Sequence, residues 1–460
     1  MSSSSIEFIP GRKKGSRNVL YDGHLYHLNR KKEDKTYWKC NKCKSRLILV
    51  QDTFCSATPH DHESQPAQIA AHRSKSKMKT LAATTESSTK QIVADSVAGL
   101  SFEASSRFNC DPKSLARLVR RARLAAYSHP VNPISLEDLV IPPNYLTSPG
   151  GDTMLLWDSS YDTNTRRSIL LGTADNINIL YQSDHLVMDG TFKTSPDLFT
   201  QLFTVHALHP TGWRIPAAFG LLPGKRTIMY ENILNELDSY GPFYPQSVLV
   251  DYEIAIRNAV SNVWPGTTLR GCWFHFKQSL WRHLQSEGLA ADYSIDNSPI
   301  RKSFMQIGAL PFVPVSDVDQ AWRLLKPSLP AEMTAFARYF ESTWIGTTST
   351  PPLFSHDSWN HHEASQMLLP RSSNVAEGWN SGFASLVNCH NPSIWKFLEC
   401  IKREQALTDV KITNILTRRP FKRAAKWEKF DLEIQRIVDD YDNFGDVTEF
   451  LKAVGSKILG

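Results

Sequence analysis

The stretch Leu186-Val187-Met188-Asp189-Gly190-Thr191-Phe192 decides how the centre of this 460-residue chain folds. Its first three residues form a short apolar run that is typical of a buried strand, and Asp189 closes that strand. Outward from it, further apolar runs lie at 202–207, 217–222, 248–250 and 269–274, with helical periodicity at 227–237 and 253–263. The pattern predicts the order β-β-β-α-β-α-β, which indicates a sheet packed against helices.

Three acidic residues stand out by their position relative to these elements. Asp189 closes the first strand, Asp251 directly follows the fourth strand, and Glu377 lies on a predicted helix within Ser373-Asn374-Val375-Ala376-Glu377-Gly378-Trp379-Asn380. If the first and fourth strands are neighbours, their ends bring two carboxylates side by side, and a helix packed across the sheet adds the third. Such a site suits two Mg²⁺ or Mn²⁺ ions, which take oxygen ligands and promote in-line phosphoryl transfer. A second interpretation of Asp251 is that it caps the helix that follows.

A pattern of metal-binding residues marks the N-terminal region: Cys40 and Cys43, then sixteen residues, then His60 and His62. A Cys-x2-Cys turn places two thiolates on one edge of a tetrahedral zinc site. Histidines one residue apart on a strand point to opposite faces. Both therefore reach one ion only if they use different ring nitrogens or if the chain bends. Four ligands fill the shell of Zn²⁺, which predicts a structural site.

The composition around these residues divides the chain into regions. Short strand candidates at 19–21, 25–28, 36–40 and 46–50 surround the zinc ligands, and Asp22-Gly23 is a hairpin signal. The predicted regions are a zinc module at 6–63, a flexible linker at 64–90, a helical region at 91–145, a strand-rich core at 150–400 with a helical insertion at about 277–367, and a helical C-terminal region at 401–460.

Charge is mild overall but uneven along the chain. The formal net charge is +6, and twelve Lys and Arg residues lie before residue 47. A second basic group, Arg117, Arg120 and Arg121, lies on a helix predicted to begin near Asp111-Pro112. This helix face is either solvated or laid on DNA. Seven cysteines do not make a disulfide framework, and no apolar run is long enough to cross a bilayer. The chain is therefore expected to be soluble, intracellular and without a membrane partner.

The zinc region resembles the FLYWCH-type zinc finger. The resemblance lies in Tyr37-Trp38-Lys39-Cys40, Cys43, the upstream Gly23 and Tyr26, and the final His-x-His. That family is a small β-sheet around one zinc, related in shape to WRKY domains, and it implies that a sheet edge enters the major groove of DNA. The candidates for phosphate or base contacts are then Lys39, Lys42, Lys44 and Arg46. Some fingers of this type bind protein instead.

Four motifs of the strand-rich region resemble those of Mutator-like (MULE) transposases. They are Asp189-Gly190-Thr191-Phe192-Lys193, Asp251 followed by Ala255 and Ala259, the Cys-x2-His of Gly271-Cys272-Trp273-Phe274-His275-Phe276, and the segment from Asn374 to Asn380. The resemblance implies an RNase H-like fold with a mixed β-sheet and a helical insertion. Its catalytic DDE triad would be Asp189, Asp251 and Glu377.

The pair Cys272 and His275 lies near the active site in that family, and its role stays open. The pair could pack in the core, position DNA or the transition state, or bind metal. One Cys and one His make at best half of a zinc site.

The favoured function is a DDE transposase that cuts and rejoins DNA at transposon ends. Its partners would be double-stranded DNA with terminal inverted repeats and a second copy of the chain, and its compartment the nucleus. The retention of all three acids favours this hypothesis. One alternative is a domesticated transposase that binds DNA as a regulator without cutting. Another is a zinc-finger protein-interaction module on an inert scaffold.

Overall fold

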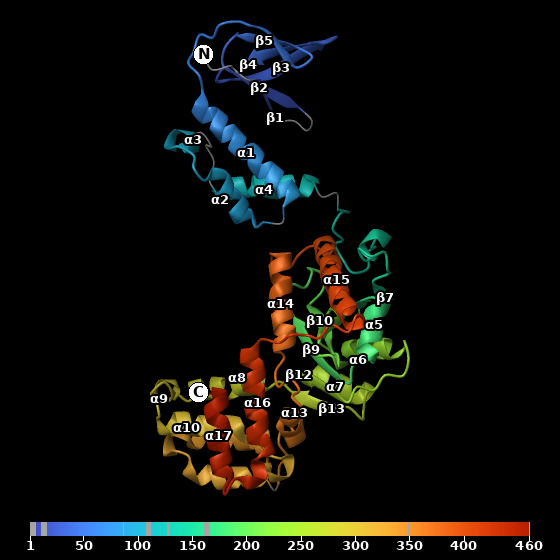
Figure 1. Cartoon of the computed structure of the whole chain (residues 1–460), viewed down its shortest axis with the longest axis vertical. Helices are drawn as coiled ribbons and strands as arrows, with labels where there is room; N and C mark the ends of the chain where they lie inside the picture. Colours follow the sequence, from blue (N-terminus) through green and yellow to red (C-terminus); the bar gives the residue numbers. More distant parts are fainter. Residues whose placement is uncertain are drawn as a thin grey trace. The chain divides into compact units, whose positions relative to one another are not determined.

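The computed structural model describes residues 6–10, 16–85, 87–106, 112–126, 129–160, 166–347 and 349–459. The chain divides into two compact units, Met1–Val131 and Asn132–Gly460 (Figure 1). The predicted helix cap at Asp111 lies outside the described residues.

Unit 1 begins with a six-stranded antiparallel meander. Its strands, in the spatial order of the sequence, are β1(Glu7–Pro10), β2(Arg17–Tyr21), β3(His24–Lys32), β4(Lys35–Cys40), β5(Arg46–Val50) and β6(Thr53–Ala57). The four strands predicted from the sequence are β2 to β5. The hairpin between β2 and β3 is confirmed, because Asp22 and Gly23 have φ of 49° and 73°. A Cβ at Gly23 would also lie 2.8 Å from the Cβ of Ser64, so the chain needs glycine there.

Four helices complete unit 1: α1(Pro66–Thr84), α2(Thr89–Val97), α3(Phe102–Ser106) and α4(Pro112–Ala126). The prediction of a flexible linker at 64–90 is wrong, because α1 fills most of it. Its alanines and lysines, which suggested low complexity, are strong helix formers. Tertiary packing then stabilises the helix, since Met78 is buried against Ile92 and Val119. At its other end, Ile69 packs with Leu20 of the β-sheet.

Unit 2 is built on a seven-stranded mixed sheet in the order β13-β12-β9-β10-β11-β8-β7. The strands are β7(Leu155–Asp158), β8(Ile169–Leu171), β9(His185–Thr191), β10(Gln201–Leu208), β11(Arg214–Leu222), β12(Ser247–Val250) and β13(Thr268–Gly271). With α6(Thr227–Asp238) and α7(Ile254–Val263), the strands from β9 onward have the predicted order β-β-β-α-β-α-β. The mixed sheet is confirmed, since β9, β12 and β13 run parallel while β10 and β11 are antiparallel.

Two details of the sheet differ from the prediction. The last strand ends at Gly271 instead of residue 274, because α8(Trp273–Ser286) begins there with Cys272 as its N-cap. The sheet is also extended by β7 and β8, with α5(Ala174–Tyr181) following them. These strands are four and three residues long, too short to give a clear periodic signal.

The two faces of the sheet are covered by different helices. Leu186, Met188, Val248 and Val250 belong to the core that includes residues of α6 and α7. The alternate residues Val187 and Leu249 instead pack against Ala376 of α14(Asn374–Val387). Because successive side chains of a strand alternate between faces, Asp189 and Asp251 belong to the face that α14 covers.

A helical body lies between β13 and α14 in the sequence. Its helices are α8, α9(Ala290–Tyr293), α10(Pro299–Ala309), α11(Val318–Leu325), α12(Thr334–Phe340) and α13(His362–Gln366). The C-terminal helices α16(Ala425–Asp439) and α17(Val447–Leu459) share their core, which includes Phe276, Trp322 and Phe450. A Cβ at Gly455 would lie 2.9 Å from the carbonyl oxygen of Met305, so α17 approaches α10 closely. The long helix α15(Ile394–Leu416) packs beside α14 on the sheet (Figure 1).

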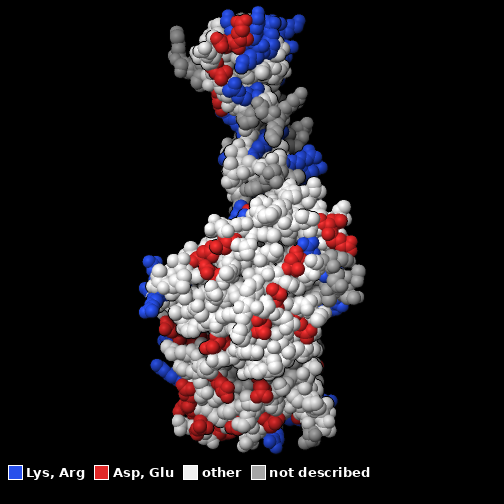
Figure 2. Space-filling view, turned by 90° about the vertical axis from the view of Figure 1, so that its right-hand side faces the viewer, with Lys and Arg blue, Asp and Glu red and all other residues white. Residues whose placement is uncertain are grey.

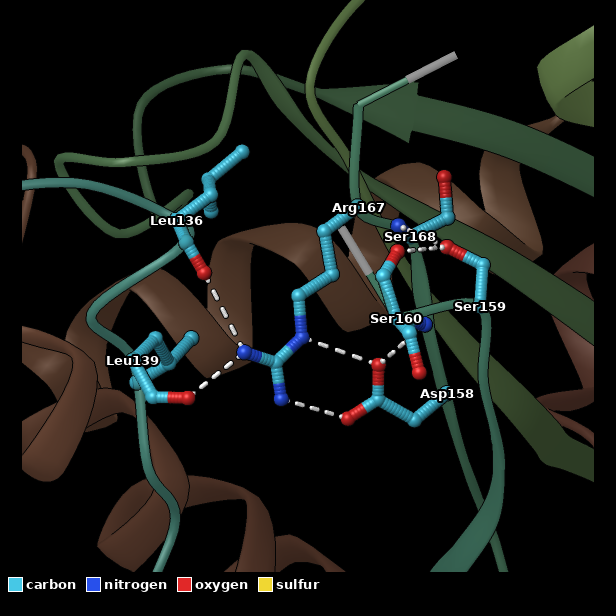
Figure 3. Close-up of polar contacts among 7 residues, drawn as sticks. All are labelled: Leu136, Leu139, Asp158, Ser159, Ser160, Arg167 and Ser168. Atoms are coloured by element: carbon cyan, nitrogen blue, oxygen red, sulfur yellow. Dashed lines mark hydrogen bonds and ion pairs between the residues drawn. The ribbon is translucent and has the colours of Figure 1, made fainter. Parts of the chain in front are cut away.

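Arg167 fixes the segment that leads into unit 2 against the sheet (Figure 3). Its Nε and Nη2 donate to the two carboxylate oxygens of Asp158 at 2.9 and 2.6 Å. Its Nη1 donates to the carbonyl oxygens of Leu136 and Leu139 at 3.1 and 2.5 Å. A bidentate pair of this kind is strong when it is shielded from water, and the Arg167 side chain is only 13% exposed. The contact holds Leu136 and Leu139 in the core beneath α14 and α15.

None of the helices in the described ranges combines the length and the apolar character that a membrane span requires.

We expect Met78→Ala to destabilise unit 1 by about 2–4 kcal/mol, because it opens a cavity between α1, α2 and α4. Amide hydrogen exchange across 66–84 should be slow in the wild type and much faster in the variant. Met78→Leu, which conserves volume, is the control and should exchange nearly as slowly as the wild type. Rapid exchange of these amides in the wild type would support the linker instead.

Candidate functional site

The predicted acids meet on one face of the sheet in unit 2. The last paired residues of β9 and β12 are Val187 and Leu249. Continuing this parallel register by two residues puts Asp251 beside Asp189. Glu377 lies one residue after Ala376, which packs on Val187 and Leu249. The structure therefore brings Asp189, Asp251 and Glu377 to one place from two neighbouring strand ends and a helix.

The pKa of Asp189 is shifted by its burial and by the acids near it. Burial, then the charge of Asp251 and more weakly that of Glu377, raise its pKa to about 6, while His275 acts in the opposite sense. Asn380 Nδ2 donates to Asp189 Oδ2 at 2.8 Å. Ionising Asp189 at this place is thus unfavourable without a cation.

The donors at this place fit a hard divalent cation. Asp251 and Glu377 lie close enough to Asp189 for their charges to raise its pKa, and the buried Asn380 Oδ1 has no hydrogen-bond partner among the described residues. Mg²⁺ and Mn²⁺ prefer oxygen ligands of this kind. Asp189, Asp251 and Glu377 are therefore the residues that would hold such an ion.

Asp251 and Glu377 are each oriented by a local contact. Asp251 Oδ1 accepts the backbone N–H of Glu253 at 2.9 Å, in a tight turn before α7. The N-cap of α7 is Glu253, so the interpretation of Asp251 as the helix cap does not hold. Ser373, the N-cap of α14, donates its hydroxyl to Glu377 Oε1 at 3.0 Å.

Cys272 and His275 lie next to the third acid. Ligand atoms of Cys272, His275 and Glu377 all lie within 4.8 Å of one another. A hydrogen bond with Cys272 raises the pKa of His275 above its ordinary value, against the burial that would lower it. Burial would raise the pKa of the Cys272 thiol, but hydrogen bonds from His275 and Ser373 bring it below its usual range. A pair that only packed in the core would not need these hydrogen bonds.

The four predicted zinc ligands of unit 1 also converge. Ligand atoms of Cys40, Cys43, His60 and His62 lie within 4.8 Å of one another. Cys43 Sγ is 3.3 Å from Nδ1 of His60, and Cys40 Sγ is 3.3 Å from Nε2 of His62. The two histidines thus use different ring nitrogens, one of the two geometries expected from the His-x-His spacing. Two sulfurs and two nitrogens match the donor set of a structural zinc site.

The surroundings of this cluster suit zinc as well. Tyr26 Oη lies 2.6 Å from Nε2 of His60, and Nδ1 of His62 lies 2.8 Å from the carbonyl oxygen of Glu63. Such partners fix the ring orientation of metal-binding histidines. The backbone N–H groups of Lys42 and Ser45 donate to Cys40 Sγ and Cys43 Sγ at 3.4 and 3.3 Å, which stabilises thiolates.

Basic side chains gather on the finger (Figure 2). The predicted DNA contacts Lys39, Lys42, Lys44 and Arg46 are all exposed. Lys39 faces Arg46 directly across β4 and β5. Like charges placed opposite each other destabilise a sheet, so this pair favours an anionic partner. The β3–β4 hairpin adds Arg30, Lys31, Lys32 and Lys35, which are also exposed and which the sequence analysis did not select.

The predicted contacts on α4 form a second basic surface in unit 1. Arg117, Arg120 and Arg121 are exposed, whereas Leu115 and Val119 face the helical core. The helix is thus amphipathic, with its basic side available to a partner.

Comparison with known families matches one segment in each unit of the chain. Residues 8–62 match the FLYWCH zinc finger domain, and residues 185–279 match the MULE transposase domain. The chain therefore contains a FLYWCH zinc finger and a MULE transposase domain, which suggests the DDE transposase family and implies DNA binding in general. No curated protein matches the chain.

The extent of each match bears on the site residues. The finger match includes all four zinc ligands. The transposase match includes Asp189, Asp251, Cys272 and His275, but it ends before Glu377. The place of Glu377 in the site therefore depends on the packing of α14.

Two site residues, Ser373 and Asn380, were not recognised as partners of the acids from the sequence. Both lie on the same helix face as Glu377, four residues before it and three residues after it. This helical spacing was the available signal, but it gains meaning only once α14 is known to lie on the sheet.

We expect Cys40→Ser to remove one zinc per chain and to unfold the β-sheet of unit 1, because metal binding supplies folding free energy to such modules. Zinc content and hydrogen exchange across 17–57 are the measurements, and unit 2 should keep its thermal transition. Cys55→Ser, at an exposed position of β6 outside the cluster, is the control. An unchanged zinc content in Cys40→Ser would contradict the ligand assignment.

We expect Asp189→Asn to stabilise unit 2 at neutral pH in the absence of added divalent cations. A pKa of about 6 in the folded chain, against 3.8 in the unfolded chain, means that the stability contributed by Asp189 is fully present below about pH 4, and that about 2–3 kcal/mol of it is lost as the pH rises through 4 to 6. The asparagine variant should lack this loss. Thermal unfolding from pH 4 to pH 8 measures it, and a constant difference in Tm across that range would contradict the assignment.

Proposed function

We propose that the protein is a DDE-type transposase that cleaves and joins DNA at transposon ends. The observation that carries this proposal is the convergence of Asp189, Asp251 and Glu377 from two parallel strand ends and α14, within a chain that contains a MULE transposase domain. Three half-buried acidic side chains that lie close together repel one another, which is costly for folding. A reaction that needs divalent cations explains why they are there.

The reaction has two steps that follow from phosphodiester chemistry. In the first, a water oxygen attacks phosphorus and the bond from phosphorus to the 3′-oxygen breaks. The 3′-oxygen takes up one proton, the other water proton passes to solvent, and a 3′-hydroxyl and a 5′-phosphate result. In the second, that 3′-hydroxyl attacks a phosphorus of target DNA and displaces the 3′-oxygen of the target strand. Mg²⁺ or Mn²⁺, when bound, supplies activation of the attacking oxygen and stabilisation of the leaving oxygen.

The residues of the chain have separate roles in these steps. Asp189, Asp251 and Glu377 provide the carboxylate oxygens that hold the cations. Asn380 holds Asp189 through its Oδ2, and Ser373 holds Glu377 through its Oε1. Asp189 and Glu377 are thereby kept at a fixed orientation, and Asp251 is oriented by the backbone N–H of Glu253. In-line transfer requires such fixed ligands.

Unit 1 is proposed to hold the DNA. Two exposed basic surfaces carry this proposal: Lys39, Lys42, Lys44 and Arg46 on the finger, and Arg117, Arg120 and Arg121 on α4. Their partners are the phosphates and bases of double-stranded DNA at the terminal inverted repeats. Joining two ends calls for at least two copies of the chain, and genomic DNA as the substrate implies the nucleus.

We expect Asp189→Ala, Asp251→Ala and Glu377→Ala each to reduce cleavage of inverted-repeat DNA in Mg²⁺ or Mn²⁺ by about 10³-fold or more, because each removes a cation ligand worth several kcal/mol in the transition state. DNA binding, measured by mobility shift, should persist. The substrate is the DNA that flanks the gene, and Asp292→Ala, an exposed acid in the helical body, is the control.

Two outcomes would contradict the transposase proposal. Tight binding of the repeats without cleavage by the wild type would indicate a domesticated DNA-binding regulator. Equal cleavage by Asp251→Ala and the wild type would remove that residue from the catalytic site.

A further inference from the structure

Two groups of Cys, His and acidic side chains among the described residues bring their ligand atoms within 4.8 Å of one another. One is the zinc quartet of the finger. The other is Cys272, His275 and Glu377, at the start of α8 and on α14 in unit 2. The ligand atoms of both groups lie within the same distance of one another, so the second group can be compared directly with the zinc ligands of the finger.

The surroundings of Cys272 resemble those of the finger thiolates. Its side chain is fully buried, and the backbone N–H of Ser373 donates to its Sγ at 3.3 Å. The finger thiolates accept backbone N–H groups at 3.3 and 3.4 Å in the same way. The hydroxyl of Ser373 lies another 3.3 Å from Cys272 Sγ. A backbone N–H that donates to a buried sulfur stabilises its thiolate form, which is the form that binds metal.

The other two side chains are also suited to be ligands. His275 Nδ1 is buried and makes no hydrogen bond to any described residue. A buried polar nitrogen in this state is unfavourable unless it finds a partner. Glu377 is oriented by Ser373, whose hydroxyl donates to its Oε1. Ser373 therefore contacts both Cys272 and Glu377 and fixes the distance between them. Residues that hydrogen-bond to the ligands of a metal orient those ligands in the same way.

The donor types select the class of ion. Sulfur, imidazole nitrogen and one carboxylate oxygen are ligands of Zn²⁺ and similar borderline-soft cations. Mg²⁺ requires oxygen ligands and does not favour a thiolate. Three protein ligands also leave one tetrahedral position open, so a weaker and exchangeable site is expected compared with the finger.

We propose that Cys272, His275 and Glu377 form a second site for a zinc-class cation, which shares Glu377 with the carboxylate centre. Binding at this site is independent of the proposed transposase function. Its consequence does rest on that function: with the site filled, Glu377 is engaged by the second cation and is no longer available to Asp189 and Asp251.

The test is zinc stoichiometry of the full-length chain, measured at equilibrium with buffered free Zn²⁺ and corrected for the free ion. The wild type should hold two zinc ions per chain, whereas Cys272→Ser and Cys40→Ser should each hold one. Cys389→Ser, which alters an exposed thiol outside both clusters, should hold two. One zinc per wild-type chain, or two in Cys272→Ser, would overturn the proposal.

A second variant and a second readout guard against misfolding of the Cys272→Ser chain. His275→Gln changes a less buried position and should also lose one zinc. Titration of Cys40→Ser with Co²⁺ should still produce a thiolate-to-cobalt charge-transfer band, and the double variant Cys40→Ser/Cys272→Ser should not. No band in Cys40→Ser whose unit 2 keeps its thermal transition would overturn the proposal independently of stoichiometry.

The consequence is tested with cleavage in Mg²⁺ at rising Zn²⁺. Inhibition should follow occupancy of the second site, and cleavage that is unchanged when the wild type holds two zinc ions would overturn the sharing of Glu377. A wild type that cleaves no DNA at any zinc level would count against the transposase proposal, while the stoichiometry would still decide whether the site exists.

Discussion

The parallel pairing of β9 with β12 is the constraint on which the rest of unit 2 depends. Its register places Asp251 beside Asp189, and strand alternation turns both towards α14. The same alternation leaves Val187 and Leu249 as the surface on which Ala376 packs. A shift of one residue in this register would turn the carboxylates into the core on the other face of the sheet. It would also remove the apolar surface on which α14 packs. The register of the sheet therefore determines both the position of the two aspartates and the packing of α14, the helix that carries the third acid.

The sequence predicts those parts of the fold in which one strong local signal suffices. Buried strands such as 248–250 are recognised as short apolar runs. The order of elements along the chain from β9 to β13 follows from these runs and from the helical segments that separate the parallel strands. The helix α1 was missed because its alanines and lysines were read as low complexity, while its stability comes from Met78 and Ile69 packing on distant elements. The contacts of Ser373 with Cys272 and of Asn380 with Asp189 could not be predicted for a similar reason, since only tertiary structure brings these residues together.

The described residues present two kinds of donor set for metal ions, soft sulfur and nitrogen donors and hard oxygen donors, and unit 2 contains both kinds side by side. The finger presents two sulfurs and two nitrogens, whereas the centre at Asp189 presents oxygens. Cys272 and His275 add soft donors beside the last of these oxygens, at Glu377. The sequence motif contains only the Cys-x2-His pair, which is half of a zinc site. Packing α14 against the N-terminus of α8 supplies the third donor, so the chemistry of the pair depends on a helix about a hundred residues further along the chain.

The helical body can be large without moving the three acids, because the residues at which it leaves and rejoins the sheet domain lie next to each other. The chain leaves the sheet at Cys272 and returns at Ser373, and these residues are linked by the bond from the Ser373 N–H to Cys272 Sγ at 3.3 Å. Next to them, the N–H of Trp273 donates to the carbonyl oxygen of Arg371 at 2.8 Å. Arg371 in turn forms an ion pair with Asp431 of α16, at a site where both side chains are largely buried. The C-terminal helices thus brace the point from which α14 starts, and the orientation of Glu377 depends on them as well as on the sheet.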